Sequence, residues 1–372
     1  MTGGAETLRV LMLSPPASAG GPLPKIVPEL QSALRRRAAA VDWLPWGSRG
    51  SPETAAVRLL SRLGDAMSAR RFLLAHPATV LLVHTTHDWR AVPRDLLLLS
   101  LCRKHAACSV LVLHGSAPGG VAASPTSLFS RLARAVFKMS DAVGVLSSEE
   151  ALAWRRLTPG SHFDVVRNPL PPPPGHSPEQ SSKPSRPRVL FVGRLIPTKG
   201  CSDLIAAFRV VRCRFDCELR IVGDGPQRAA LAQAVAAAGL CQDVFMTGTL
   251  VGPALEDEYA AATVLALPSC NEGLPTVVLE AMVRGLPVVT TRIRGSADYF
   301  TDSHDVLFVE PGAPEELAAA LERLLGDAGL RRQLAEAASL TVRQFDSDSV
   351  VSDYERVIRD ALRVAEERGY QS

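Results

Sequence analysis

The sequence lacks the features of a secreted, membrane-spanning or nucleic-acid-binding chain. Its seven cysteines are an odd number without a Cys-x-x-Cys pair, which argues against a disulfide framework or a zinc site and favours a reducing compartment. No apolar run approaches the ~18 residues that a transmembrane helix needs, and we expect no signal peptide at the first residues. No long Lys/Arg tract is present. We therefore expect a cytoplasmic protein that binds no metal and no nucleic acid.

Charge is distributed unevenly along the 372 residues. Residues 1–182 carry 20 Lys and Arg against 12 Asp and Glu, and residues 183–372 carry 21 against 26, so the net charge of +3 is the sum of +8 and −5. A basic N-terminal half suits an anionic lipid surface or a ligand that carries phosphate. Scattered, solvated arginines are the alternative explanation.

Short apolar runs alternate with helical patterns in both halves of the chain. In the N-terminal half we expect strands at 8–13, 80–83, 110–113, 142–146 and 163–166. In the C-terminal half we expect them at 188–192, 218–222, 244–246, 264–267 and 287–290. This alternation indicates βαβ units. We predict an α/β fold with two Rossmann-like, doubly wound parallel sheets and a ligand in an interdomain cleft.

A stretch rich in proline and serine divides the two patterns. It begins with four prolines at 171–174, a composition typical of a stiff linker. We predict an N-terminal domain over residues 1–175, a linker over 176–187 and a C-terminal domain over 188–346. The last helical stretch, 347–372, is long enough to pack back on the N-terminal domain.

Two cations follow the first strand of the C-terminal half. Gly193 allows a tight exit from the strand, Arg194 and Lys199 lie in the loop, and Gly200 precedes a helix. A guanidinium and an ammonium beside a helix N-terminus suit a diphosphate. An ordinary loop with solvated charges is the alternative.

Two carboxylates flank the start of a later helix in the same half. Glu272 lies in the loop, Pro275 suits the first turn of the helix, and Glu280 follows in an otherwise apolar helix where an unpaired charge would be costly. Backbone N–H groups at such a helix start favour a bound anion, and carboxylates accept hydrogen bonds from sugar hydroxyls.

The run from Arg188 to Asp298 resembles the donor domain of glycosyltransferase family 4, a retaining family with the GT-B fold. Glu272 and Glu280 have the E-x7-E spacing of that family. The matching segments are VGRLIPTKG at 192–200, LRIVGDGP at 219–226, MTGTL at 246–250 and ALPSCNEGLPTVVLEAMVRGLPVV at 266–289. The resemblance implies a C-terminal donor-binding domain and an N-terminal acceptor-binding domain.

The resemblance also implies roles for single residues. Arg194 and Lys199 would bind the donor diphosphate, Glu272 would hold the donor sugar, and Glu280 would bind the ribose. Further donor contacts are implied for Gly193, for Gly248, Thr249 and Leu250 beside the base, and for Gly273, Leu274, Pro275 and Thr276 at the helix start.

The N-terminal half adds further candidates through the same resemblance. Gly20 and Gly21 follow the first strand, where the family places a glycine-rich loop against the phosphates, although Pro22 and Pro24 depart from the usual pattern. His114 corresponds to the histidine beside the reacting sugar, so we count it with Glu272, Arg194 and Lys199 as catalytic. His84 and His87 are alternatives that would line the acceptor cleft. Asn168 precedes Pro169 where the family has Asn-Gly, so we expect it only at the domain junction.

The predicted reaction is transfer of a sugar from a nucleoside-diphosphate sugar, UDP-sugar by preference, without a metal or other cofactor. The predicted acceptor is a lipid-linked saccharide of a cell-envelope or exopolysaccharide pathway, with a small natural product as the alternative. The chain is expected to be a monomer or weak dimer. Competing interpretations are an epimerase or phosphorylase, a dehydrogenase, whose third glycine is replaced here by Arg228, and a non-catalytic sugar-nucleotide-binding paralogue.

One predicted helix has two interpretations, peripheral contact with a membrane or packing in the protein core. Residues 128–138 place Leu128, Phe129, Leu132, Val136 and Phe137 on one face with basic residues beside it. Such a helix would contact the anionic inner face of the cell membrane peripherally, or it would pack against the core of the first domain.

Overall fold

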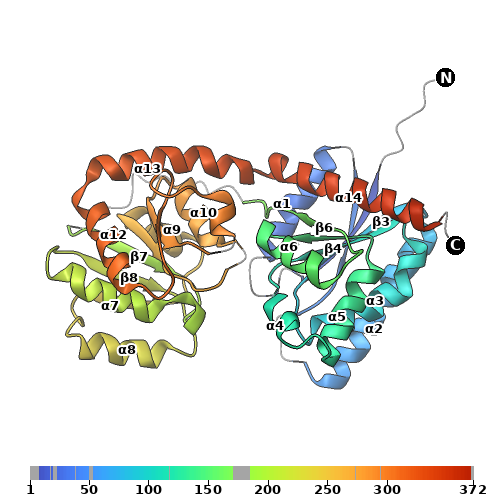
Figure 1. Cartoon of the computed structure of the whole chain (residues 1–372), viewed down its shortest axis with the longest axis horizontal. Helices are drawn as coiled ribbons and strands as arrows, with labels where there is room; N and C mark the ends of the chain where they lie inside the picture. The colour runs from blue at the N-terminus through green and yellow to red at the C-terminus, as the bar shows by residue number, and fades with distance from the viewer. Residues whose placement is uncertain are drawn as a thin grey trace. The chain divides into compact units, whose positions relative to one another are not determined.

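The computed structural model describes residues 8–16, 18–19, 23–37, 39–49, 53–116, 118–170, 185–272, 274–293 and 295–369 (Figure 1). These residues form two compact units. The N-terminal unit comprises residues 8–170 together with 345–369, and the C-terminal unit comprises residues 185–344. Each unit contains one six-stranded parallel sheet covered by helices. The α/β class predicted from the sequence is confirmed.

The N-terminal sheet has the strand order β2-β1-β3-β4-β5-β6. Its strands are β1 (Arg9–Ser14), β2 (Ala40–Pro45), β3 (Thr79–Thr85), β4 (Cys108–Leu113), β5 (Ala142–Val145) and β6 (Phe163–Val165). Its helices are α1 (Leu23–Arg36), α2 (Ala55–Ala75), α3 (Ala91–Cys102), η1 (Arg103–His105), α4 (Pro118–Ala123), α5 (Leu128–Met139), α6 (Ser148–Leu157) and α14 (Ser347–Gly369).

Side chains alternate between the two faces of this sheet, as the pleat of a strand requires. Leu11 and Leu13 of β1 pack in a cluster with α2, α3 and α5, whereas Val10 and Met12 pack on the other face with α1 and α14. The last helix of the chain thus completes the core of the first unit, and it runs along that unit's sheet in Figure 1.

The C-terminal sheet has the order β12-β11-β10-β7-β8-β9. Its strands are β7 (Arg188–Val192), β8 (Glu218–Val222), β9 (Val244–Gly248), β10 (Val264–Leu267), β11 (Val288–Thr291) and β12 (Leu307–Val309). Its helices are η3 (Pro197–Lys199), α7 (Cys201–Arg212), α8 (Arg228–Ala237), α9 (Pro253–Ala261), α10 (Thr276–Val283), α11 (Ser296–Tyr299), α12 (Pro314–Gly326), α13 (Ala328–Thr341) and η4 (Val342–Phe345).

The sequence analysis did not predict β2 or β12, each of which lies at an edge of its sheet. The β2 segment Ala-Val-Asp-Trp-Leu-Pro is only partly buried, because an edge strand lacks the second neighbour that would bury it. It therefore shows no continuous apolar run of the kind that marks a central strand.

The apolar face of α5 is part of the N-terminal core. Ala133, Val136 and Phe137 are buried there, and Phe129 and Leu132 pack against the same cluster, whereas Leu128 is exposed. The core-packing alternative accounts for this face. Among the described residues, no helix has both the length and the apolar composition to cross a bilayer.

Candidate functional site

Three loops meet at the carboxyl ends of the central strands of the C-terminal sheet. They follow β7, β8 and β10, and β7 lies between the other two strands. The Gly193 N–H donates to Val222 O at 3.0 Å, and the Leu195 N–H donates to Asp224 O at 2.9 Å. The Cys270 N–H donates to Thr198 O at 2.8 Å. Backbone hydrogen bonds therefore join the loop after β7 to both of its neighbours.

Glycine is required where these loops touch. Gly200 has φ +68°, and a Cβ there would lie 2.0 Å from Pro268 O. Gly223 has φ +138°, and a Cβ there would lie 1.9 Å from Gly193 O. Only a residue without a side chain fits both the backbone conformation and the space. The glycines of the sequence motifs thus hold the loops in contact.

Lys199 and Glu272 are brought together by these loops. The Lys199 ammonium forms an ion pair with Glu272 Oε1, and the Ser269 hydroxyl donates to the same oxygen at 2.9 Å. The Thr291 hydroxyl in turn donates to the backbone carbonyl of Ser269. Glu272 Oε2 makes no such contact among the described residues, so one carboxylate oxygen is available to a ligand.

Arg194 lies in the same loop as Lys199 but is exposed. Among the described residues its guanidinium has no carboxylate partner within ion-pair distance, in contrast to Lys199. The site thus combines one paired cation and one unpaired cation beside α7. This arrangement can accept a ligand that carries more than one negative charge.

Glu280 is held from the neighbouring helix α9. The Tyr259 hydroxyl donates to Glu280 Oε2 at 2.8 Å. Burial, together with the Glu280 carboxylate, raises the pKa of Tyr259 far above its ordinary value, so this hydroxyl keeps its proton. Arg284 lies over the Tyr259 ring at 4.7 Å and forms a two-pronged ion pair with Glu256. Tyr259 was missed in the sequence analysis, because α9 and α10 are separate in the chain and no local pattern links them.

The remaining predicted donor residues follow β9 or begin α10. Gly248 has φ +78°, Thr249 is exposed and Leu250 is half-buried. Arg228 donates to Met246 O at 3.2 Å and lies next to Gly248, a neighbour that the sequence did not suggest. Helix α10 begins at Thr276, and Pro275 is the residue just before its first turn. Leu274, which precedes Pro275, is buried. Gly273 lies outside the described residues.

His114 lies at the end of β4 in the N-terminal unit. Its Nε2 and the Nδ1 of His84 are 2.8 Å apart and share a hydrogen bond. Burial lowers the pKa of His114 to about 4, against an opposing contribution from the Asn168 side chain, and burial with the His114 interaction lowers the pKa of His84. Both rings are neutral near pH 7. Asn168, expected only as a junction residue, is therefore a neighbour of His114.

His84 and His114 line a cavity of about 720 Å³ within the N-terminal unit. His87 lies elsewhere, with its ring 4.9 Å from Phe129 and 4.8 Å from Trp154, and burial lowers its pKa to about 4 despite Asp88. Of the two alternatives from the sequence, the structure places His84 on the cavity and His87 among aromatic rings. Gly20 and Gly21 lie outside the described residues.

Comparisons with known proteins find relatives for the part of the chain that contains the candidate donor residues. Residues 186–327 match the family described as glycosyl transferases group 1. The alpha-D-kanosaminyltransferase of Streptomyces kanamyceticus is 36% identical over 155 residues, which cover 41% of this chain and 40% of that protein. The lipopolysaccharide core biosynthesis glycosyltransferase LpsD of Rhizobium meliloti strain 1021 is 32% identical over 165 residues, covering 44% and 47%. The matches thus span less than half the length of either relative.

The fold is shared over nearly the whole chain. The structure of Anabaena Alr3699/HepE in complex with UDP and glucose superposes with a TM-score of 0.70 at 17% identity, covering 95% of this chain and 99% of that one. The protein has the GT-B fold, as predicted. Within it, the glycosyl transferases group 1 match covers residues 186–327, which include the loops that hold Arg194, Lys199, Glu272 and Glu280.

Proposed function

We propose that the protein is a retaining glycosyltransferase that uses a nucleoside-diphosphate sugar, with UDP-sugar as the first choice. The observation that carries the proposal is the Lys199–Glu272 ion pair beside the unpaired Arg194, at loops held together through glycines. The cations suit the diphosphate, and the free oxygen of Glu272 suits a sugar hydroxyl. The glycosyltransferase names of the two relatives and the UDP and glucose in the HepE complex support this choice.

The proposed transfer breaks the bond between the sugar C1 and the diphosphate oxygen and forms a bond between C1 and the acceptor oxygen. The acceptor proton moves to a phosphate oxygen of the departing nucleoside diphosphate, so no base on the protein is consumed. Arg194 and Lys199 stabilise the negative charge that develops on the leaving group. Attack from the face that the diphosphate leaves accounts for retention, an expectation taken from the family resemblance.

The same cations are proposed to make a divalent metal unnecessary. Among the described residues no group of three or more histidine, cysteine or acidic side chains is arranged to hold a metal ion. We also propose a monomer or weak dimer in the cytoplasm or peripherally on the membrane. Binding of UDP that persists in a chelator would agree with metal independence, and binding that is lost on chelation would contradict it.

Two acceptor classes have support among the relatives. The name of LpsD supports a saccharide of the cell envelope, built on a lipid-linked intermediate. The name of the kanosaminyltransferase supports a small natural product. We place the envelope acceptor first because the N-terminal half of the chain is basic, which suits a ligand at an anionic surface.

The proposal is tested by charge removal in the C-terminal unit. We expect Lys199→Ala and Glu272→Ala each to lower the rate of UDP release from UDP-sugars by about 10²-fold or more, since each removes charge at the reacting diphosphate or sugar. The matched control is Arg214→Ala, which breaks an exposed 2.7 Å ion pair with Glu322 in the same unit and should leave the rate unchanged. Full activity in Lys199→Ala would refute the site, and absence of binding to any nucleotide would refute the function.

A further inference from the structure

The cavity beside His84 and His114 has the size and the polar lining of a small-molecule binding site. Its 720 Å³ falls within the range of roughly 300–1,000 Å³ of small-molecule sites. All of its lining residues belong to the N-terminal unit. They come from helices α2 and α3, from the segment that joins β3 to α3, and from the ends of β1, β2, β3 and β4 with the residues that follow them. The first residues of both helices, Ala55 and Ala91, lie on its wall. Two helix N-termini therefore add positive potential to the cavity.

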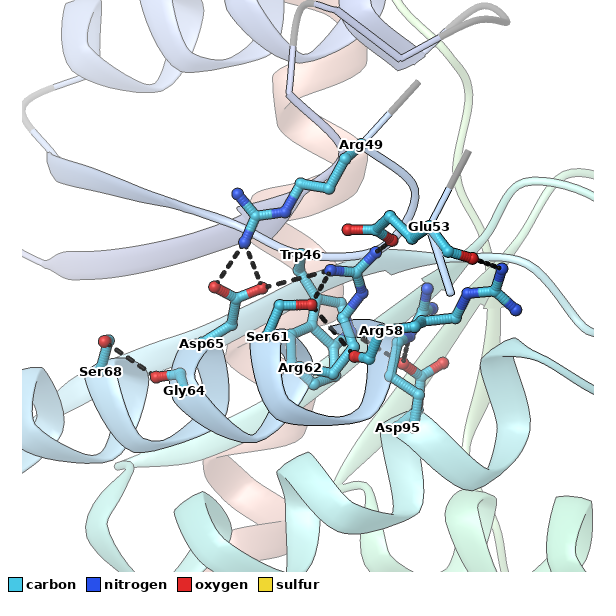
Figure 2. Close-up of polar contacts among 11 residues, drawn as sticks. Trp46, Arg49, Glu53, Arg58, Ser61, Arg62, Gly64, Asp65, Ser68 and Asp95 are labelled. Atoms are coloured by element: carbon cyan, nitrogen blue, oxygen red, sulfur yellow. Dashed lines mark hydrogen bonds and ion pairs between the residues drawn. The ribbon is translucent and has the colours of Figure 1, made fainter. Parts of the chain in front are cut away.

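Four arginines line this cavity, and two of them serve the structure. Arg62 donates to Glu53 Oε2 at 2.7 Å, and it lies between Glu53 and Asp65 in Figure 2. Arg94 donates to Asp95 Oδ1 at 2.9 Å, and the same oxygen accepts from Trp46 Nε1 at 2.8 Å. These ion pairs are neutral as units, so they shape the wall without attracting a charged ligand.

The other two arginines have no carboxylate partner. Arg58 makes one side-chain hydrogen bond, from Nη2 to the backbone carbonyl of Glu53 at 3.1 Å, as Figure 2 shows. No hydrogen bond or ion pair from the Arg90 side chain exists among the described residues. Both guanidinium groups lie on the lining of the same cavity, and no carboxylate neutralises either of them among the described residues. Their charge is therefore available to a ligand.

The remaining carboxylate of the cavity wall is already engaged. Asp88 accepts from the Thr86 hydroxyl at 2.8 Å and from the backbone N–H groups of Arg90 and Ala91 at 2.7 and 3.0 Å. Asp88 binds the backbone at the start of α3 and forms no ion pair within 4 Å among the described residues, although the Arg94 charge contributes to lowering its pKa. Two unpaired guanidinium groups against this one carboxylate leave the lining with a net positive charge.

The lining of the cavity also offers a buried polar atom and apolar surface. The Nε2 atom of His84 is buried without a hydrogen-bond partner among the described residues, which leaves a polar atom for a hydroxyl to satisfy. Leu59 and Leu97 contribute apolar surface. A ligand with an anionic group and a hydroxylated ring fits this distribution.

We propose that this cavity binds an oxyanion carried by the acceptor, a phosphate or carboxylate group, through Arg58 and Arg90. The proposal rests on the proposed function, because it assigns the acceptor to the N-terminal unit. It goes further by requiring a negative charge on the acceptor. The planar guanidinium fork grips such groups in a bidentate manner that an ammonium does not match.

The experiment uses the full chain and inorganic phosphate as the probe. All four tryptophans, at 43, 46, 89 and 154, lie in the N-terminal unit, so tryptophan fluorescence reports the thermal unfolding of that unit. Titration is done in an Arg194→Ala, Lys199→Ala background, which removes the phosphate-binding groups of the C-terminal unit. Chloride at matched ionic strength controls for screening.

Phosphate is expected to raise the fluorescence-detected midpoint, and Arg58→Gln and Arg90→Gln are each expected to weaken phosphate binding by about 10-fold or more. Arg103→Gln, an exposed arginine of η1 outside the cavity, is the matched control and should bind as the parent does. Equal phosphate binding in the Arg58→Gln, Arg90→Gln double variant, or none in the parent, would overturn the proposal.

Two further arms identify the source of the oxyanion. Glucose 6-phosphate represents a soluble acceptor, and vesicles of phosphatidylcholine with phosphatidic acid represent a lipid phosphate. Binding of either one that depends on Arg58 and Arg90 supports the proposal and assigns its source, whereas binding of both that is indifferent to the two arginines contradicts it. Nucleotide binding to the unmodified protein is measured separately, so its failure would refute the proposed function and leave the cavity test intact.

Discussion

The two units of this protein share a parallel-sheet architecture but build their sites differently. In the C-terminal unit the candidate residues lie in short loops, and glycines such as Gly200 bring backbone against backbone. In the N-terminal unit the candidate residues are scattered from Arg58 to His114; His84 and His114 are paired and buried, whereas Arg58 and Arg90 have no carboxylate partner among the described residues. The first site depends on backbone conformation, whereas the second depends on buried rings and unpaired charge.

The difference extends to the chemistry of the side chains. His84, His87 and His114 are buried in the N-terminal unit with lowered pKa values, whereas His304 is the sole histidine among the described residues of the C-terminal unit. All four tryptophans also lie in the N-terminal unit. Acid and glycine substitution should therefore act on different units, and fluorescence can tell the units apart.

The largest effect is expected from a Cβ added where two loops of the C-terminal unit touch. We expect Gly200→Ala to lower the free energy of unfolding of the C-terminal unit by about 4 kcal/mol or more, because the Cβ would meet Pro268 O at 2.0 Å. Gly239→Ala is the matched control, since Gly239 has φ +72° but an open surrounding. It should cost about 1 kcal/mol from backbone strain alone. Urea unfolding followed by circular dichroism measures both, and equal losses would contradict the role of the contact.

A second prediction concerns acid. The folded pKa of His87 and of His114 is about 4, below the unfolded value of about 6.5. The unfolded chain therefore binds protons first, and stability falls as the pH drops from 6.5 towards 4. Between pH 7 and 5 each of these histidines should cost about 2 kcal/mol.

The measurement is urea unfolding at the two pH values, followed by tryptophan fluorescence. His87→Phe removes one titrating group from a ring cluster that already contains Phe129 and Trp154. That variant should lose about 2 kcal/mol less than the parent over the same pH range. A stability of the N-terminal unit that does not change between pH 7 and 5 would rule out this account.

The smallest expected effect concerns the hydrogen bond from the Tyr259 hydroxyl to the Glu280 carboxylate. Tyr259→Phe removes the 2.8 Å hydrogen bond to Glu280 Oε2 and should lower the free energy of unfolding by about 1 kcal/mol. Nucleotide affinity should fall with it if Glu280 binds the ribose. A double-mutant cycle with Glu280→Gln isolates the pair, and strictly additive effects would show that the two side chains are not coupled.

The sequence predicted the fold class and most central strands, because buried parallel strands are continuous apolar runs. The predicted ranges 188–192, 218–222 and 264–267 coincide with β7, β8 and β10. Helix α2 was not apparent, since Leu59 and Leu60 are exposed on it and its apolar residues do not form one stripe. The roles of the named site residues stay predictions.

The site was predictable where neighbours in sequence are neighbours in space. The spacing from Arg194 to Gly200 and from Glu272 to Glu280 describes loops and a helix start, which are local structures. The contacts that hold them are not local, since Tyr259 reaches Glu280 from another helix and the Cys270 N–H donates to Thr198 O of the loop after β7. A sequence motif therefore predicts contacts between residues that are close in the chain, but it does not predict contacts between separate helices or loops.

The position of α14 has a consequence for synthesis on the ribosome. Its residues Val350, Tyr354, Val357 and Ile358 are buried in the core of the N-terminal unit, although they are translated after the whole C-terminal unit. The C-terminal unit can therefore emerge and fold while the first unit still exposes the face of its sheet that α14 covers. At roughly 5–20 residues per second, that face waits for many seconds, and a nascent chain stalled before residue 345 would present it to chaperones.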